Sequence, residues 1–214
     1  LFLSLAWGLA NTLTLFVNTY FWEFEATQIK YFLPIYLIGT LLAFYITPRI
    51  VKILEKRTVV LIAIAGVGIF SPAAFVMYNL GFTPEKGSLE LVFFISFFLV
   101  FLITLNVMGI MVRDSMVGDI ADEVELQSGK RQEGILFATV GFMQKLNAGL
   151  GGFFAGLVLN FINFDRTNHT AEQAYTLAFI QGPVTTLLMV IPIIIFFGYS
   201  LSSERHKEII DSLK

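Results

Sequence analysis

The chain of 214 residues contains no cysteine and little charge. The absence of cysteine excludes a disulfide framework, a thiolate metal site and a thiol nucleophile. Charged residues make up only 14% of the chain, whereas a soluble globular domain usually carries about 25%. The net charge of -2 gives no indication of nucleic-acid binding.

Apolar residues are what the chain has in excess. They make up 56% of the sequence, which includes 23 phenylalanines, and the mean hydropathy is +0.77. A water-facing surface for a chain of this size could not be so poor in charge, whereas a lipid-facing surface can. The composition therefore predicts an integral membrane protein.

Long apolar runs predict six transmembrane helices and an all-α membrane fold. A helix needs roughly 20 apolar residues to cross a hydrocarbon core of about 30 Å. Backbone groups in lipid must be paired within the segment, which favours helices for such runs. The approximate spans are 1–22, 31–50, 59–80, 89–112, 134–164 and 175–200.

Basic residues fall mainly on one side of the predicted membrane. If the loops alternate sides, three basic residues lie on one side, namely Lys30, Lys86 and Arg166. The other side holds Arg49, Lys52, Lys56, Arg57, Arg113, Lys130, Arg131, Arg205, Lys207 and Lys214. The positive-inside rule makes this richer side cytoplasmic, together with the tail at 201–214. The opening LFLSLAWGLA has no basic flank, and we expect the chain to be a fragment whose N-terminal portion is missing.

A single lysine interrupts the fifth predicted span. Lys145 lies about 17 Å along the helix from Gly134, at 1.5 Å per residue, which is near mid-bilayer. A lysine there costs several kcal/mol and normally faces a polar interior or a partner charge. All sixteen acidic residues lie in loops or at span ends. We therefore expect Lys145 to act in transport, facing a water-filled cavity or a counter-ion outside this chain. The alternative is a structural lysine held by helix carbonyls.

Other polar side chains at membrane depth are candidates to line a cavity. With Lys145, the predicted substrate and coupling residues are Gln144, Asn147, Asn11 and Asn106. Thr14 is a further candidate, although each of these side chains alone is more often a helix-packing residue than a ligand contact. The aromatic residues Trp7, Tyr20 and Trp22 are candidates for stacking or for the membrane-interface belt. The position of Tyr20 and Trp22 near a helix end favours the belt.

Small residues repeat every four positions after the lysine. Ala148, Gly152 and Gly156 form this repeat, with Gly149 and Gly151 beside it. Small residues at this spacing allow helix backbones to approach closely, so the repeat predicts a packing face.

The cytoplasmic connection at 112–134 is rich in acidic residues. These acids resemble the first turns of a short helix, and Gly129 is a plausible helix stop. One interpretation is a solvated charged loop. The other is a cytoplasmic gate of several ion pairs acting together, since an exposed pair contributes only about 0–1 kcal/mol. The predicted gate residues are Asp119, Asp122, Glu125, Arg131 and Glu133.

The run 115–159 resembles a known transporter segment. It is similar to the helix 10–loop–helix 11 region of the glycoside–pentoside–hexuronide:cation symporters, a branch of the major facilitator superfamily. NTYFWEF at 18–24 is similar to helix 7 of many bacterial members, and SSERH at 202–206 resembles their ending after helix 12. The positions that match the family pattern are Asp119, Asp122, Glu125, Gly129, Arg131, Glu133, Gly134 and Lys145.

The resemblance implies the C-terminal six-helix half of such a symporter, in a bacterial inner membrane. Each half contains two inverted three-helix repeats, and the substrate binds near the midplane. It implies Na⁺ or H⁺ as coupling ion, bound mainly by the missing N-terminal half, and no other cofactor. The melibiose-permease branch has polar residues where this chain has Val140 and Gly141. A lysolipid-like or other amphiphilic solute therefore stays open beside a sugar.

Two other functional classes follow less well from the residues. An intramembrane protease needs a Ser–His pair, two aspartates or a zinc site at depth. The two histidines, His169 and His206, lie outside the predicted spans, and no aspartate lies at membrane depth. We therefore expect no enzyme. A non-transporting scaffold or sensor is the second alternative, but a scaffold has no need for the mid-bilayer Lys145.

Overall fold

The computed structural model describes residues 2–130 and 132–196, and helices make up nearly all of this part. The predicted cytoplasmic tail at 201–214 lies outside the described residues. In chain order the elements are α1 (Phe2–Phe16), the π-helical η1 (Val17–Phe21), α2 (Ala26–Ile29), α3 (Phe32–Ile50), α4 (Lys56–Asn79), α5 (Leu89–Ser128), α6 (Glu133–Phe161), α7 (Ala171–Phe179), the π-helical η2 (Ile180–Val184), α8 (Thr185–Leu188) and α9 (Val190–Phe196).

Three helical stretches in the described part are long and apolar enough to cross a membrane. They are Ala26–Ile50, Lys56–Asn79 and Leu89–Ser128. They coincide with the second, third and fourth predicted spans. The last predicted span, 175–200, contains four short elements in its described part, from α7 to α9.

Helix α5 is longer than the sequence predicts. It continues to Ser128, past the predicted end of the span at Val112. Asp119, Asp122, Glu123 and Glu125 therefore lie on an extension of α5 and not on a separate short helix or in a loop, while Glu133 is the first residue of α6. The helix stop at Gly129 is confirmed: this glycine has a left-handed φ of 67°, and its N–H donates to the Glu125 carbonyl oxygen.

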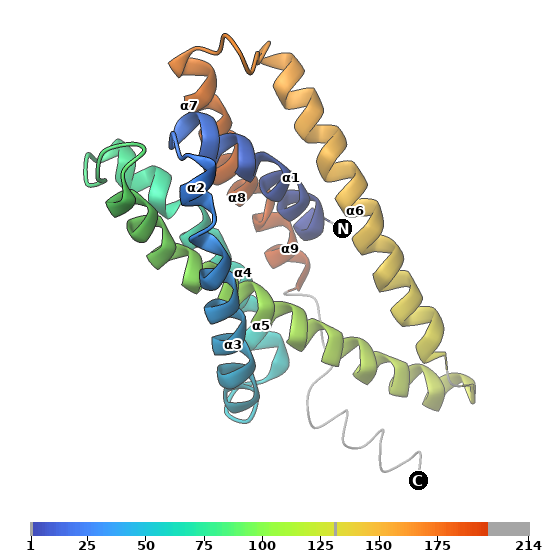
Figure 1. Cartoon of the computed structure of the whole chain (residues 1–214). Coiled ribbons are helices and arrows are strands. Elements are labelled where there is room, and N and C mark those ends of the chain that lie inside the picture. The colour runs from blue at the N-terminus through green and yellow to red at the C-terminus, as the bar shows by residue number, and fades with distance from the viewer. Residues whose placement is uncertain (1, 131, 197–214) are drawn as a thin grey trace.

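The helices pack in two groups, as Figure 1 shows. Helices α3 and α4 both pack on α5, while α6 packs mainly on α1. Two apolar cores hold these groups together. One core surrounds Leu13, Phe21 and Leu177, and the other surrounds Val59 and Met108.

Glycines bring the backbones of α1 and α6 into direct contact. A Cβ added to Gly151 would lie 2.5 Å from the carbonyl carbon of Gly8, and one added to Gly8 would lie 2.8 Å from the Asn147 carbonyl oxygen. The face of α6 that packs on α1 therefore runs through positions 147, 151 and 155, which are all buried. The sequence predicts a packing face one position further along. In this chain, Gly152 and Gly156 have open space beside them.

The loop between α4 and α5 contacts α2 and η1. The Gln28 amide Nε2 donates to the carbonyl oxygen of Gly87 over 2.6 Å. The Lys86 ammonium lies 4.2 Å from the ring centre of Phe21.

In the loop between α6 and α7, the backbone N–H and hydroxyl of Thr167 donate to Asp165. These bonds stabilise the carboxylate and lower the pKa of Asp165.

Candidate functional site

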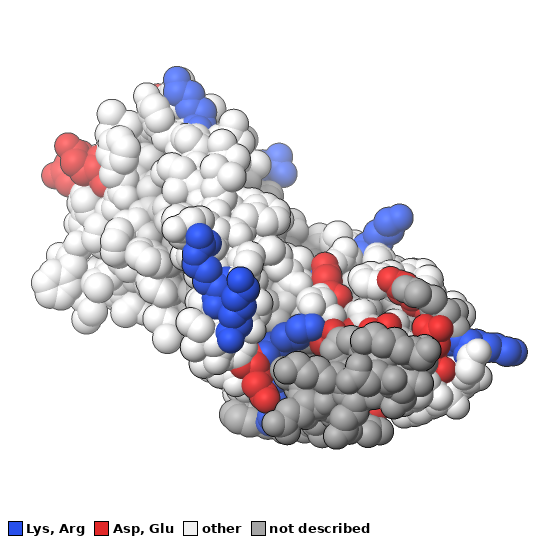
Figure 2. Space-filling view, turned by 90° about the horizontal axis from the view of Figure 1, so that it is seen from below, with Lys and Arg blue, Asp and Glu red and all other residues white. Residues whose placement is uncertain are grey.

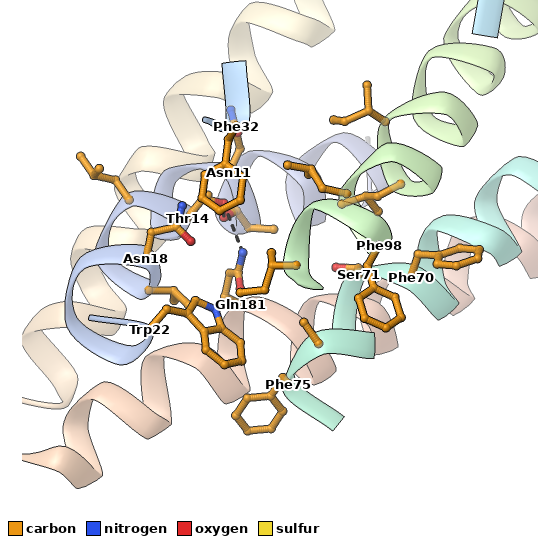
Figure 3. Close-up of a pocket in the computed structure, with 18 of the residues that line it drawn as sticks. Asn11, Thr14, Asn18, Trp22, Phe32, Phe70, Ser71, Phe75, Phe98 and Gln181 are labelled. Atoms are coloured by element: carbon orange, nitrogen blue, oxygen red, sulfur yellow. Dashed lines mark hydrogen bonds between the residues drawn. The ribbon is translucent and has the colours of Figure 1, made fainter. Parts of the chain in front are cut away.

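A pocket of about 400 Å³ lies among α1, η1, α3, α4, α5 and η2. Figure 3 shows 18 of the residues that line it. Asn11, Leu15, Leu33 and Tyr36 line it and are exposed, so they lie at its open side. Pockets that take small molecules have volumes of about 300–1,000 Å³, so this pocket is of a suitable size.

One face of α1 and η1 supplies a stripe of polar and indole side chains. The residues recur every three or four positions, which places them on one side of a helix. All of them line the pocket: Trp7, Asn11, Thr14, Asn18 and Trp22. Trp22 is only 5% exposed, and its ring contacts those of Phe21 and Tyr78. The interface-belt interpretation is therefore wrong for Trp22, because its place in the stripe turns it toward the pocket and away from lipid.

Gln181 reaches the same end of the pocket from η2. Its amide Nε2 donates to the Thr14 hydroxyl over 3.2 Å, and that hydroxyl donates to the Ala10 carbonyl oxygen over 2.8 Å. Figure 3 marks the Gln181–Thr14 bond with a dashed line. Among the described residues, the side-chain oxygen Oε1 of Gln181 and the side-chain amides of Asn11 and Asn18 have no hydrogen-bond partner. These groups are available to a solute.

Both π-helical segments border the pocket. Asn18 lies in η1 and Gln181 lies in η2. In η2, Pro183 has no N–H to donate and its ring crowds the preceding turn, which explains a widened turn there. Such bulges occur frequently at functional sites. Gly182 lets η2 lie close to α4, since an added Cβ would lie 3.3 Å from the Cα of Pro72.

The opposite end of the pocket is apolar. Figure 3 shows Phe70, Phe98 and Ser71 at this end, away from Asn18 and Gln181. The other apolar residues that α5 contributes to the pocket are Ile95, Leu99, Leu102 and Ile103. Among the described residues, no lysine, arginine, aspartate or glutamate lines the pocket. The site therefore offers amides, a hydroxyl and the Trp22 indole ring at one end and mostly hydrocarbon at the other.

The structure brings only one of the predicted substrate and coupling residues, Asn11, to this pocket. Lys145 and Gln144 lie on an exposed side of α6. Asn147 is 2% exposed, and in the described part of the chain neither polar atom of its amide has a hydrogen-bond partner. Asn106 is partly buried on α5, away from the pocket lining. A role for these four residues in coupling stays a prediction.

The sequence analysis missed Asn18 and Gln181. Asn18 could have been found, because it continues the spacing of Asn11 and Thr14 by one further helical turn. Gln181 carries no such signal. Its direction depends on the π-helical turn at Pro183, which neither hydropathy nor the 3.6-residue period indicates.

The predicted gate residue Asp119 pairs with Lys56, which is not one of the predicted gate residues. Its carboxylate lies 2.6 Å from the Lys56 ammonium at the start of α4. Asp122, Glu125 and Glu133 are partly buried near the same end of the molecule, and Arg131 lies outside the described residues. Figure 2 shows acidic and basic side chains gathered around this end, beside a broad uncharged surface.

The helices and the pocket define a membrane protein built around a small uncharged site. The chain belongs to the MFS/sugar transport protein family, whose model matches residues 1–202. This membership places it among membrane transport proteins and not among enzymes.

Two curated relatives match parts of the chain. The uncharacterized symporter YnaJ of Bacillus subtilis (strain 168) is 32% identical over 96 residues, which are 42% of this chain and 20% of the relative. The putative glycoside/cation symporter YagG of Escherichia coli (strain K12) is 25% identical over 92 residues, which are 43% of this chain and 19% of the relative. The chain therefore matches about a fifth of each relative's length.

Proposed function

We propose that the intact protein is a secondary active transporter that couples entry of a sugar or related small solute to Na⁺ or H⁺ by alternating access. The observation that carries this proposal is the pocket, in which side-chain amides lie beside the Trp22 ring and, among the described residues, no charged side chain is present. A sugar is uncharged, its hydroxyls bond to amides, and its apolar ring face packs on indole rings. The family membership and the names of the two relatives agree with this solute class.

The proposed architecture is the C-terminal half of a transporter with two six-helix halves. It has six spans in two inverted three-helix repeats, with a cytoplasmic tail and a bacterial inner-membrane location. The helical stretches at the six predicted positions support this arrangement. The shares of the two relatives that match leave room for a further half in each of them.

Lys145 is proposed as the coupling residue, with Gln144, Asn147 and Asn106 around it. Its side chain is exposed on α6, and no ion pair of Lys145 is found in the described part of the chain. An ammonium at mid-bilayer is stable only beside water or an opposite charge. Carboxylates that bind the coupling cation in the missing half would supply that charge.

The charged end of α5 is proposed as the cytoplasmic gate. The Lys56–Asp119 pair connects α4 to the α5 extension, and both side chains are partly shielded from water. The other members are Asp122, Glu125, Arg131 and Glu133. Opening the cytoplasmic side would separate some of these pairs, while solute binding in the pocket would be retained.

Uptake by the intact protein in liposomes tests the proposal. Radiolabelled methyl glucoside, galactoside and xyloside are offered with a Na⁺ gradient, a proton gradient or neither. At least one sugar should accumulate only with a gradient, and Lys145→Ala should uncouple accumulation from it. Lys145→Arg should also impair transport, because its planar head does not reproduce a compact ammonium. Lys52→Ala, at an exposed loop lysine, is the matched control. Accumulation of none of the sugars, or equal uptake without a gradient, would overturn the proposal.

A further inference from the structure

We propose that the apolar end of the pocket is a subsite for an apolar substituent of the solute. The preferred solute is then an uncharged, hydroxylated ring that carries an aromatic or alkyl group. This inference rests on the proposed function, because it assumes that the pocket binds the transported solute.

The polar end matches the hydroxylated part of such a solute. The Gln181 side chain uses one N–H for Thr14 and keeps its oxygen Oε1 available, so it can accept a hydrogen bond from a solute hydroxyl. Asn11 and Asn18 each add a donor and an acceptor on the same face of α1 and η1. The indole ring of Trp22 lies beside Gln181 and completes this end of the pocket.

The other end does not suit a sugar hydroxyl. Phe70 and Phe98 form its walls, together with aliphatic side chains of α5. Ring contacts hold both walls in place, since Phe70 stacks on Phe101 at 5.1 Å and Phe98 meets Phe94 edge-on at 5.3 Å. Ser71 is the one hydroxyl seen beside them. A solute hydroxyl buried there would lose its bonds to water with few replacements, whereas a phenyl or alkyl group would gain from leaving water.

The uncharged lining in the described part of the pocket restricts the class of solute further. An ionised head group buried without a partner is strongly disfavoured in an apolar environment. In the described part of the chain, the pocket lining includes no lysine, arginine or carboxylate to pair with such a head group. The pocket therefore favours an amphiphile with a neutral hydroxylated head over a lysophospholipid or a sugar acid.

Competition against uptake by the intact protein tests the subsite. Labelled methyl glycosides of glucose, galactose and xylose are each competed with the unlabelled methyl and phenyl glycosides of the same sugar. Burial of a phenyl ring should make the phenyl compound roughly tenfold more effective than the methyl compound. Lysophosphatidylcholine serves as the charged-head competitor and should compete poorly.

Substitutions at each end of the pocket test which end causes the preference for the phenyl compound. Phe98→Ala should remove most of the phenyl preference with little effect on the methyl compound, and the milder Phe98→Leu should remove part of it. Phe93→Ala is the matched control, because Phe93 is an exposed phenylalanine of the same helix that does not line the pocket. Gln181→Leu should weaken both compounds equally and leave their ratio unchanged.

The outcomes separate this inference from the proposed function. Coupled uptake of a methyl glycoside without phenyl preference would overturn the subsite but not the proposed transport function. The same holds for a preference that survives both Phe98 variants. Strong competition by lysophosphatidylcholine would also overturn the neutral-head assignment. Uptake of no glycoside at all would overturn the proposed function and the subsite with it.

Discussion

Replacing Asn147 by leucine should make the protein more stable. The side chain is 2% exposed, and neither Oδ1 nor Nδ2 has a hydrogen-bond partner in the described structure. Leucine has the same branched shape, so it fills the space between α1 and α6 without burying unpaired polar atoms. Because α1 and α6 already cover this residue, no part of the protein outside this chain can reach the amide unless the two helices separate.

The expected gain can be estimated from the cost of an unpaired amide. Mutational data on buried polar groups without partners give about 1–3 kcal/mol. For a domain of this size, each kcal/mol corresponds to about 2–4 °C in melting temperature. Thermal unfolding of the purified intact protein in detergent, followed by tryptophan fluorescence, measures the shift. If Asn147 has its predicted role in coupling, uptake should fall although the melting temperature rises.

Asn79→Leu is a matched control that should change stability in the opposite direction. The Nδ2 of Asn79 donates to the Phe75 carbonyl oxygen over 2.8 Å, and its Oδ1 accepts a bond from the Tyr175 hydroxyl over 2.9 Å. Asn79→Leu removes both bonds and should lower stability by about 1 kcal/mol. If Asn147→Leu also lowers the melting temperature, the Asn147 amide is paired, for example to a buried water, and the reasoning fails.

Three further changes probe the packing, the gate and the topology. Gly151→Ala and then Gly151→Val should lower the free energy of unfolding stepwise by about 1–3 kcal/mol, because the added carbon meets the α1 backbone; equal melting temperatures of all three proteins would contradict the close contact. A double-mutant cycle of Lys56→Met and Asp119→Leu should show coupling of about 1 kcal/mol in thermal unfolding, and strict additivity would show that the pair contributes nothing. A cysteine at Ser88 should react with an impermeant thiol reagent from outside and one at Ser203 should not; the reverse would refute the orientation.

Hydropathy predicts helix positions well in this chain because each apolar run ends at charge or at a turn. The predicted ranges 31–50 and 59–80 differ from α3 and α4 by only a few residues. The predicted range 89–112 ends early for a physical reason. Hydropathy records where lipid ends, whereas the helix continues in water until Gly129 adopts a left-handed conformation.

The pocket was only partly predictable. Asn11 and Thr14 stand out as polar residues in an apolar run, so composition alone identifies them. Gln181 depends on the widened turn of η2, and the packing face through Gly151 depends on the rotation of α6 against α1. Small residues recur every four positions on more than one face of α6, and the sequence does not show which face packs on α1. Only the backbone contact at Gly8 distinguishes these faces.

The geometry suggests how a solute in the pocket and a lysine outside it can influence each other. One face of α1 carries Asn11 and Thr14 into the pocket, and a neighbouring face presents Gly8 to α6. At this contact the backbone of Gly8 meets that of Gly151, with no side chain between them to absorb a displacement. A solute that shifts α1 must therefore shift α6 or open the contact. Lys145 lies on α6 less than two turns before Gly151, so such a shift would move its ammonium relative to any carboxylate outside this chain.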